Sequence, residues 1–520
     1  MVRVRVEVPG DVLGWVRVER PRETVEALGA LVGSRISTEM TLALGLGVEL
    51  GMLAVVDPGR PIDVALLGTE AAPRVVFSLC PRSPGEARTL LGERYRLVAD
   101  PRVGERLEHR EDAGAAGRAG LSCALVVTDD AVGSRVACAS DVATLQRAGA
   151  WIAMRAVPHG SDAGAPMGIV GWMGEALVRK AQGVLRREAR DGARSLEATA
   201  ASARRARETP PTYGDPEVAA RVLGAALGPW VEGLTALRAL DFGAAVTAEG
   251  MRIRVEGRLQ RGAAGRLAEL LEARAERSVE GNPVTGFLPA DAVWMGVDRA
   301  DPAAQRAWLG ELVAGGVEVL GARVRDPEAA RRDLGALFAQ NDGTAALAVS
   351  LGAAGDFELT GILPQADGGA AARAAVVRLG AAPWVRGLQL GGPLRVTAAG
   401  GALTLASEAP APVAGDAGAG AGGVASLRLE VTEAGLVAVW GRHATGSMEA
   451  LRARRGRDRM EATGGAATAV DALGAEMGIR LRVERAEGLR ATLTAEVTAR
   501  ALSLVRERLG AGRSGSVRAP

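Results

Sequence analysis

Apolar positions in the first hundred residues alternate between a period of two and helical spacing. A period of two predicts strands over residues 10–18, 62–68, 73–80 and 95–99. Helical spacing predicts a helix over 23–33, a second helical run that continues to 55, and a helix over 84–92. Ser83 is a suitable cap for the last helix, and Pro84 suits its first turn. This order predicts an α+β fold, with a mixed or antiparallel sheet and helices packed mainly on one face.

The same pattern returns about 280 residues later. Val8-Pro9-Gly10-Asp11, ahead of the first strand, matches Leu288-Pro289-Ala290-Asp291. The match keeps its register as far as Pro81, which corresponds to Pro364. Self-similarity at a nearly constant offset indicates a duplicated unit. We therefore expect two tandem pseudo-repeated halves, residues 1–281 and 282–520.

Further segments follow the same division. Leu121–Ala139 and Ser426–Gly441 each read as an added hairpin, and a turn at Glu249 and another at Glu487 each join two period-two segments. Helical patterns follow these turns at 263–277 and 495–509. The first half alone has a long helical insertion at about 168–208. The second has a Gly/Ala-rich linker at about 408–425 and a flexible tail at 510–520.

Composition narrows the function only by exclusion. The 520 residues carry 63 basic and 61 acidic groups, a net charge of +2, and include 70 glycines. Arginine dominates the basic set, and Lys180 is the single lysine, a bias typical of high-GC coding sequence. A nearly neutral chain with few aromatic residues does not fit a nucleic-acid-binding protein.

Motifs that bind metals and cofactors are missing from the sequence. Lys180 follows Arg179, so no phosphate-binding P-loop is present. The three histidines and three cysteines show neither a His-x-x-x-His nor a Cys-x-x-Cys spacing. Two Gly-x-Gly-x-x-Gly matches, at Gly418–Gly423 and Gly510–Gly515, fall in the linker and the tail, not between a strand and a helix. We expect no cofactor, no metal and no recognisable catalytic residue.

Several polar residues are nonetheless candidates for chemistry. Asp11 and Asp291 occupy matching positions, where a turn role is the simpler interpretation. Asp129 and Asp130 fit the tip of a hairpin, and His159-Gly160-Ser161-Asp162 is too short a segment to form a catalytic triad by itself. We interpret His443 as a surface or interface residue, and the arginines at 452, 454, 455, 457 and 459 as a solvated helix end. The tryptophans Trp15, Trp230, Trp294 and Trp384 are expected to be core residues.

Cys123 and Cys138 are a candidate disulfide. Their midpoint falls at the predicted turn after Asp130, so the hairpin sets the two residues opposite one another. In a reducing cytosol they would remain small buried thiols, the state that we favour from the sequence. A disulfide is the expectation for an exported protein.

The lengths and charges of the apolar segments indicate the cellular compartment in which we expect the protein. The longest of them, Thr41 to Val56, is interrupted by Glu49 and is shorter than the roughly 20 residues that span a membrane. The first eight residues alternate charge and valine, unlike the apolar region of a signal peptide. As it stands, the chain is expected to be cytoplasmic, and extracytoplasmic if an upstream signal or anchor is missing.

The segment from Leu288 to Asp298 resembles the start of the repeats in an uncharacterised family of bacterial proteins. Members of that family share a Leu-Pro-Ala-Asp start, a short hydrophobic strand and a later segment like the one from Val126 to Ser134. The resemblance covers about a quarter of the chain. It implies a duplicated α+β protein, often preceded by a membrane anchor or export signal, and it implies no activity.

Together these patterns predict a non-catalytic binding or scaffold protein. Its candidate location is the bacterial envelope if the protein is exported. Its partner is an unidentified protein or small-molecule ligand, which a groove between the two halves would hold. The alternative is a hydrolase or another enzyme that brings Asp129, Asp130 or His159 together with distant groups in a cleft. Whether the protein is an enzyme stays open.

Overall fold

The computed structural model describes most of the chain. The residues described are 8–48, 50–69, 71–83, 85–109, 121–127, 134–154, 168–206, 236–259, 265–277, 283–289, 292–321, 324–351, 357–388, 394–399, 401–407, 426–441, 444, 447–449, 477–485, 489–499 and 502–503. Their contacts divide the chain into two compact units. Unit 1 comprises residues 1–181, 237–260 and 492–520, and unit 2 comprises 182–236 and 261–491. The units therefore interleave along the chain, whereas the halves expected from the repeats, 1–281 and 282–520, are contiguous.

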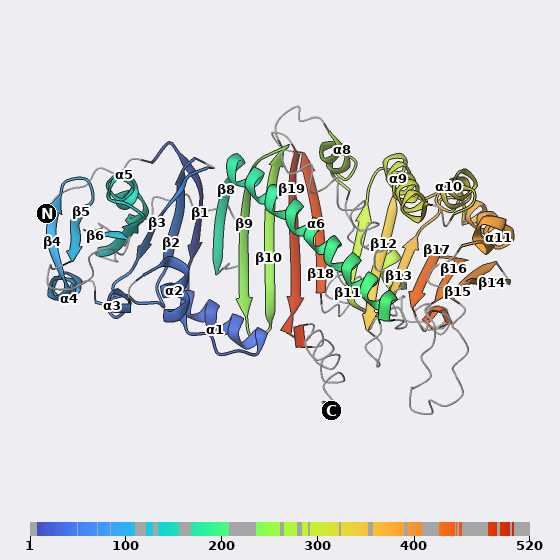
Figure 1. The fold of residues 1–520 in the computed structure, drawn as a ribbon. Coiled ribbons are helices and arrows are strands. Elements are labelled where there is room, and N and C mark those ends of the chain that lie inside the picture. Colours follow the sequence, from blue (N-terminus) through green and yellow to red (C-terminus); the bar gives the residue numbers. More distant parts are fainter. Residues whose placement is uncertain are drawn as a thin grey trace, which may run out of the picture. The chain divides into compact units, whose positions relative to one another are not determined.

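Unit 1 contains an antiparallel sheet. Its strands, in spatial order, are β4 (Tyr95–Asp100), β5 (Gly104–His109), β6 (Ser122–Val127), β7 (Ser134–Ala139), β3 (Pro73–Leu79), β2 (Ile62–Gly68), β1 (Val12–Val18), β8 (Ile169–Gly174), β9 (Leu237–Thr247) and β10 (Gly250–Leu259) (Figure 1). β10 also pairs with β19 (Leu489–Thr498). The ion pair of Arg252 with Glu496, at 2.8 Å, lies at this last pairing. The final part of the chain thus extends the sheet of unit 1.

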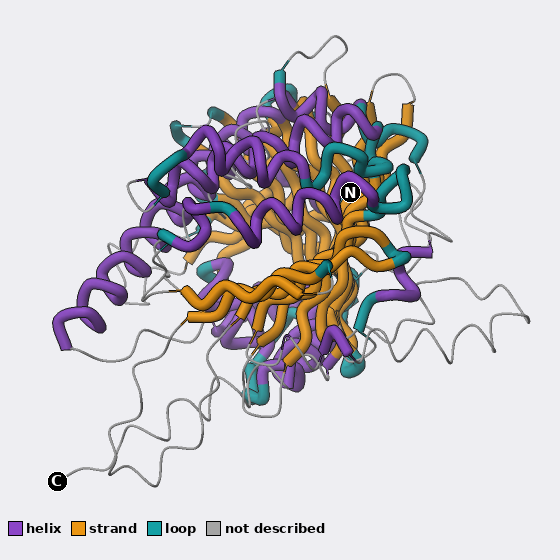
Figure 2. The backbone as a smooth tube through the Cα atoms, turned by 90° about the vertical axis from the view of Figure 1, so that its right-hand side faces the viewer, coloured by secondary structure: helices purple, strands orange, loops and turns teal. Residues whose placement is uncertain are grey.

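Helices cover both faces of this sheet. Cys138 and Val136 point to a core shared with α3 (Leu50–Leu53) and α4 (Ala87–Arg94), whereas Ala137 and Ala139 point to a core shared with α5 (Val142–Ala153). Side chains of adjacent strand residues point to opposite faces, so α5 and α4 lie on opposite sides. Figure 2 distinguishes helices from strands along the backbone and shows helical segments packed against strands. The expectation that helices cover mainly one face is therefore wrong for unit 1.

The remaining helices of the first 206 residues are α1 (Pro21–Val32), α2 (Thr38–Leu46) and α6 (Glu175–Ala206). α6 corresponds to the long helical insertion expected at 168–208, whose first residues form β8 instead. α4 begins at Ala87, three residues after the predicted start at Pro84, which lies outside the described residues; ahead of the helix Glu86 N donates to Ser83 O at 3.0 Å.

Unit 2 contains a second sheet. Its strands, in spatial order, are β18 (Met477–Arg485), β11 (Ala292–Arg299), β12 (Thr344–Leu351), β13 (Phe357–Leu363), β17 (Gly435–Gly441), β16 (Ser426–Thr432), β15 (Ala402–Ser407) and β14 (Leu394–Ala399). β18 runs parallel to β11 and all the other pairs are antiparallel. Unit 2 is therefore a mixed sheet, as the sequence predicts.

Four helices of unit 2 share one core. They are α9 (Pro302–Leu320), α10 (Pro327–Ala336), α11 (Ala370–Ala381) and α12 (Pro383–Arg386), and they pack with Leu403, Leu429 and Leu436 of the sheet. A second core on the other side of β17 contains Val437 and Val439 with Val284 of the 3-10 helix Pro283–Phe287. Unit 2 also contains α8 (Arg266–Glu272). The predicted helix over 495–509 is wrong at its start, because Ala495–Thr498 are part of β19.

Seven strands of each unit have the same order. The order 1-2-3-7-6-5-4 in unit 1 corresponds to 11-12-13-17-16-15-14 in unit 2. Leu13 is an extra residue in β1 opposite β2, and Val293 is an extra residue in β11 opposite β12. Among the described residues, no helix is both long enough and apolar enough to cross a membrane.

Candidate functional site

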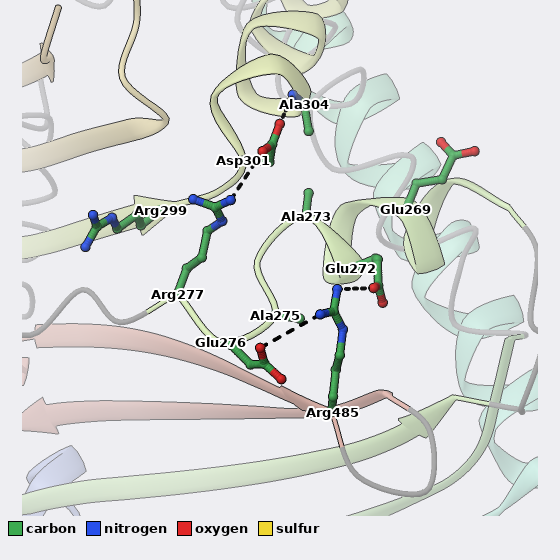
Figure 3. Close-up of a pocket in the computed structure, with 10 residues that line it drawn as sticks. All are labelled: Glu269, Glu272, Ala273, Ala275, Glu276, Arg277, Arg299, Asp301, Ala304 and Arg485. Atoms are coloured by element: carbon green, nitrogen blue, oxygen red, sulfur yellow. Dashed lines mark hydrogen bonds and ion pairs between the residues drawn. The ribbon is translucent and has the colours of Figure 1, made fainter. Parts of the chain in front are cut away.

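An open pocket of about 780 Å³ lies within unit 2. Three elements line it with the end of β11: α8 and the turn after it, the first turn of α9, and the end of β18 (Figure 3). The lining residues are Glu269, Glu272, Ala273, Ala275, Glu276, Arg277, Arg299, Asp301, Ala304 and Arg485. Seven of these ten side chains carry a charge, so the walls of the pocket are polar. The other three residues are alanines, whose small side chains occupy little of the pocket volume.

Helical spacing gathers the acidic residues on one wall. Glu269 and Glu272 are three residues apart on α8, and Glu276 follows in the next turn. Glu276 has a φ of 61°, the left-handed region that side chains other than glycine seldom adopt. Its backbone N donates to Val483 O at 3.1 Å, which fixes the turn against β18. This turn brings Glu276 beside Arg485, at the end of the same strand.

A buried arginine forms a rigid base beside the pocket. Arg274 donates to Asp298 through Nε at 2.7 Å and Nη2 at 2.5 Å, and through Nη1 to Leu270 O at 2.7 Å. Its guanidinium also lies 5.9 Å from the ring centroid of Trp308, within the range of a cation–π contact. Ala273 and Ala275, on either side of Arg274 in the chain, line the pocket. These contacts tie the α8 turn to β11 and α9.

The first turn of α9 forms the opposite wall. Asp301 caps this helix by accepting from Ala303 N at 3.0 Å and Ala304 N at 3.3 Å, and Pro302 occupies the first helical position. Asp301 N donates to Ala273 O at 2.7 Å, so the two walls are joined through the backbone. The position of Asp301 is thus set by main-chain hydrogen bonds.

The charged side chains of the pocket form solvent-exposed ion pairs. Arg485 donates to Glu272 and lies 3.8 Å from Glu276, and Arg277 Nη2 donates to Asp301 at 3.2 Å (Figure 3). Side chains in these pairs are 39% to 65% exposed. Exposed pairs of this kind contribute only about 0.2–1 kcal/mol each to stability. A ligand can therefore replace them at little loss of free energy.

The chemistry of the lining is restricted to carboxylates and guanidiniums. The ten residues include no hydroxyl, thiol, imidazole or amine that could act as a nucleophile. In the described part of the chain, no three His, Cys, Asp or Glu residues are arranged to hold a metal ion. Carboxylates and guanidiniums in this arrangement can bind charged groups of opposite sign by charge-assisted hydrogen bonds.

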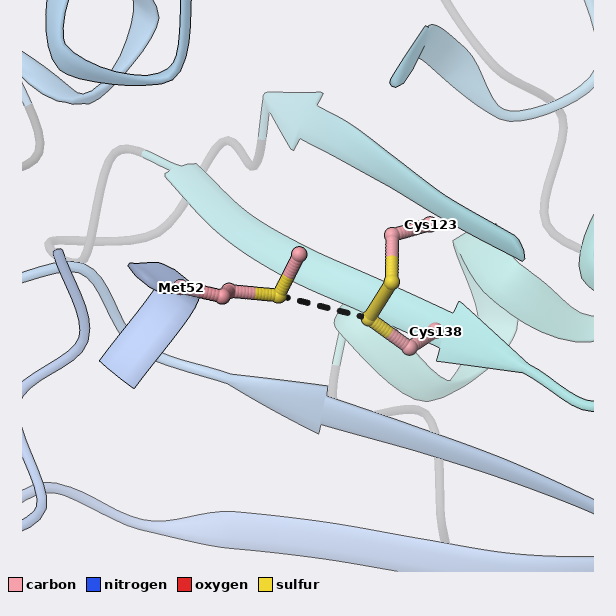
Figure 4. Close-up of a disulfide and its surroundings, with 3 residues drawn as sticks. All are labelled: Met52, Cys123 and Cys138. Carbon is pink, nitrogen blue, oxygen red and sulfur yellow. Dashed lines mark hydrogen bonds between the residues drawn. A yellow bond between two sulfur atoms is a disulfide. The ribbon is translucent and has the colours of Figure 1, made fainter. Parts of the chain in front are cut away.

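Unit 1 holds the candidate disulfide. Cys123 on β6 lies opposite Cys138 on β7, with Cα atoms 4.0 Å apart and the two sulfurs bonded at 2.10 Å (Figure 4). Met52 Sδ lies 3.8 Å from Cys138 Sγ in the same core. Cys80 is buried and not bonded to another cysteine. The hairpin thus sets the two residues opposite one another, as the sequence predicts. The structure has them bonded, whereas the sequence favours two thiols, and a mass measurement distinguishes the two states.

Unit 1 also contains a buried ionic cluster of Arg17, Asp63 and Arg135. Arg17 Nε donates to Asp63 Oδ1 at 2.5 Å, and Arg135 Nη1 donates to Asp63 Oδ2 at 2.7 Å. Arg135 Nη2 donates further to Pro61 O at 2.6 Å. All three side chains are at most 1% exposed, so a ligand in solvent does not reach them. The cluster is a structural feature of the sheet.

The residues selected from the sequence do not meet in one site. Asp11 forms an ion pair with Arg147 at 3.0 Å, and Gly68 N donates to its carbonyl at 3.0 Å, a turn role. Trp15 and Trp384 are buried, and Trp384 Nε1 donates to Asp333 at 2.9 Å. Trp294 is partly exposed. The other candidates lie outside the described residues: Asp129, Asp130, His159, Ser161, Asp162, Trp230, Asp291, His443 and the arginines of 452–459.

Sequence reasoning missed the pocket. The helical pattern at 263–277 was visible, and the acidic residues on one face of it were the available signal. Arg485, however, lies 213 residues after Glu272 in the sequence, and Asp301 is the N-terminal cap of a different helix, α9. Such long-range partners are not contained in a local pattern.

Comparison with protein-family models, with curated proteins and with solved structures finds no match to this chain. The resemblance of Leu288–Asp298 to an uncharacterised bacterial family therefore stays a prediction.

Proposed function

We propose that this chain is a non-catalytic binding or scaffold protein that holds a charged ligand in the pocket of unit 2. The observation that carries this proposal is the composition of the lining, in which seven exposed charged side chains surround a volume of about 780 Å³. Small-molecule sites have volumes of about 300–1,000 Å³ but are mostly apolar. The size supports ligand binding, and the charged walls favour a polar ligand over an apolar one.

Catalysis fits this lining poorly. An enzyme site commonly places a nucleophile or base beside groups that orient it, within hydrogen-bond distance. The carboxylates of Glu272, Glu276 and Asp301 are instead paired with arginines and exposed to solvent. The alternative hydrolase would depend on Asp129, Asp130 or His159, which lie outside the described residues, so no observation favours it.

A ligand screen with product analysis tests the proposal. Charged small molecules and short peptides would be screened for a rise in melting temperature, which any ligand selective for the folded state produces. Each hit would then be incubated with the protein and analysed by mass spectrometry. We expect hits to be recovered unchanged. Conversion of a hit to a product, absent in Arg277→Gln or Glu272→Gln, would identify an enzyme and overturn the proposal.

We further propose that the two units descend from one duplicated α+β unit. The shared order of seven strands and the extra residue at Leu13 and Val293 support this. So does an isolated bridge outside each of two hairpins, that of Val56 with Pro81 outside β2–β3 and that of Asn341 with Gln365 outside β12–β13. The test is a chimera in which residues 62–79 and 344–363 are exchanged. We expect it to fold cooperatively, and an unfolded chimera would count against equivalent hairpins.

An oxidising compartment, such as the bacterial envelope, belongs to the same proposal. Disulfides persist in such compartments and are rare in the cytosol, and the bond between Cys123 and Cys138 supports this location. The partner that we propose is a protein or small-molecule ligand, not a nucleic acid, because the chain carries 63 basic and 61 acidic residues and is close to neutral.

A further inference from the structure

We propose that the chain forms a twofold-symmetric dimer in which β14 of unit 2 pairs antiparallel with β14 of a second copy. The inference goes beyond the proposed function, because β14 (Leu394–Ala399) contributes no residue to the pocket. It follows from the hydrogen-bonding register of β14 and from an exposed apolar side chain beside this strand.

β14 is an edge strand of its sheet. Among the described residues it pairs with β15 alone (Figure 1). Its register with β15 is continuous, so it has no bulge, and it contains no proline. Bulges and prolines are devices that commonly prevent an edge strand from pairing with another chain. The strand therefore presents an uninterrupted row of backbone groups on its outer side, where another strand can pair.

The turn between β14 and β15 decides which residues face outward. Ala399 pairs with Ala402 across a two-residue loop, which makes this a hydrogen-bonded pair of the ladder. Hydrogen-bonded and non-hydrogen-bonded pairs alternate along an antiparallel ladder. Leu394, Val396 and Ala398 therefore direct their backbone N–H and C=O groups away from β15, toward the outer side.

These outward groups complement a second copy of themselves. When Val396 lies opposite the partner's Val396, Leu394 lies opposite the partner's Ala398, and every outward N–H and C=O of the three residues gains a partner. Between these pairs, Arg395 lies opposite the partner's Thr397, so the charged residue faces a hydroxyl and not a second guanidinium. This self-complementarity favours a second copy over an extended segment of another protein. A twofold pairing is closed and stops at two copies.

α11 (Ala370–Ala381) adds an apolar contact beside this edge. A Cβ at Gly380 would lie 2.7 Å from Ala398 Cβ, so the flank of α11 that contains Gly380 faces β14. Val377, three residues earlier on the same flank, is 61% exposed. Its side chain is thus placed to pack on the strand that a second copy adds.

The oligomeric state of the full chain tests the proposal. Sedimentation velocity over a concentration series should show a reversible equilibrium between monomer and dimer for the wild type. Thr397→Lys places a lysine opposite the partner's Arg395 at two symmetric positions and should raise the dissociation constant at least about threefold, whereas Thr397→Glu should lower it. Thr404→Lys is the matched control, because Thr404 lies opposite Thr397 on β15, one strand away from the edge.

A cysteine at the centre of the dimer reports the register. Val396→Cys, treated with oxidised glutathione, should yield a disulfide-linked dimer, because Cα atoms of a hydrogen-bonded pair lie about 5.5 Å apart, within disulfide range. Thr404→Cys should not, since three strand spacings, at least about 14 Å, separate it from its counterpart. The wild type should not cross-link either, because Cys80 is buried and Cys123 is bonded to Cys138.

A wild type that stays monomeric at every concentration would overturn the proposal. Assemblies larger than a dimer would overturn it too, because they require an edge that does not close on itself. A dimer that Thr397→Lys leaves unchanged, equal effects of lysine and glutamate at this position, or no cross-link in Val396→Cys would each contradict the register. Thermal melts establish that each variant is folded.

Discussion

Arg135 on β7 and Asp63 on β2 form an ion pair at 2.7 Å in which neither side chain is more than 1% exposed. Arg17, opposite Asp63 in the pairing of β1 with β2, donates to the same carboxylate. The corresponding opposed residues of β11 and β12 are Val297 and Ala346. One unit therefore has charged residues where the other has apolar ones, at the same place in the sheet.

Removal of the shared carboxylate should destabilise unit 1 strongly. Asp63→Asn removes the charge of the carboxylate that the two buried guanidiniums share, and loss of one partner of a buried ion pair costs about 3–5 kcal/mol. The triple variant Arg17→Met/Asp63→Leu/Arg135→Met should recover most of this loss, because apolar residues of similar volume replace buried ion pairs well. Urea unfolding measures both. A single variant as stable as the wild type would contradict the role of Asp63.

Loss of the disulfide should weaken the β6–β7 hairpin. The bond closes a loop of sequence separation 15, for which the chain-entropy treatment gives about 3 kcal/mol. Cys123→Ala/Cys138→Ala should therefore unfold at lower urea concentration than the oxidised wild type, and a reductant should affect only the wild type. The native mass should rise by about 2 Da on reduction, since two thiols form. An unchanged mass would show that the cysteines are thiols.

Stability should depend on pH through Asp141, the cap of α5. Burial acts to raise the pKa of Asp141, but hydrogen bonds from Thr144 N and Oγ1, both at 2.8 Å, and the charge of Arg74 outweigh it and lower that pKa. A lowered pKa means that the carboxylate adds stability above the pKa of the unfolded chain, about 3.9, and that this contribution disappears as the pH falls through the folded value.

Two variants of Asp141 check this dependence. Asp141→Ala should lose about 1 kcal/mol near neutral pH, the usual loss of a helix cap. Asp141→Asn keeps a capping oxygen without the charge, so its difference from the wild type should shrink below about pH 3.9. Unfolding free energies measured from pH 6 downward provide the comparison. A difference that does not change with pH would show that the charge has no role.

Gly435, at the start of β17, should not tolerate a side chain. It has a φ of 114°, and a Cβ there would overlap the carbonyl of Leu363. Gly435→Ala should therefore destabilise unit 2 by more than about 1 kcal/mol. Gly316→Ala is the matched control, because nothing lies within 4 Å of its Cβ position in the interior of α9, and it should stabilise by about 0.5–1 kcal/mol. Equal melting temperatures of the two variants would contradict this.

Local patterns predicted the strands well. The period of two at 62–68 and 73–80 corresponds closely to β2 and β3, and the midpoint between Cys123 and Cys138 placed the two cysteines opposite one another. In both cases the determining contacts lie close together in the sequence.

Contacts between distant segments were not predictable in this way. Every residue of β7 from Ser134 to Ala139 is buried, and only the packed structure shows that α5 and α4 take opposite faces of its sheet. β19, which ends at Thr498, pairs with β10 of the sheet of unit 1, which a boundary near Gly281 did not foresee. The pocket likewise depends on Arg485, whose partners lie more than 200 residues earlier.

Hydrogen–deuterium exchange with and without a charged compound identified by the thermal screen tests most directly whether ligand binding occurs in the pocket of unit 2. The account predicts slower exchange in peptides covering residues 269–277 and 299–304, with no change in β4, β5 or α5 of unit 1. The same measurement on Glu272→Gln/Glu276→Gln should show no such protection. Protection confined to unit 1, or protection of residues 269–277 that persists in this variant, would contradict the account.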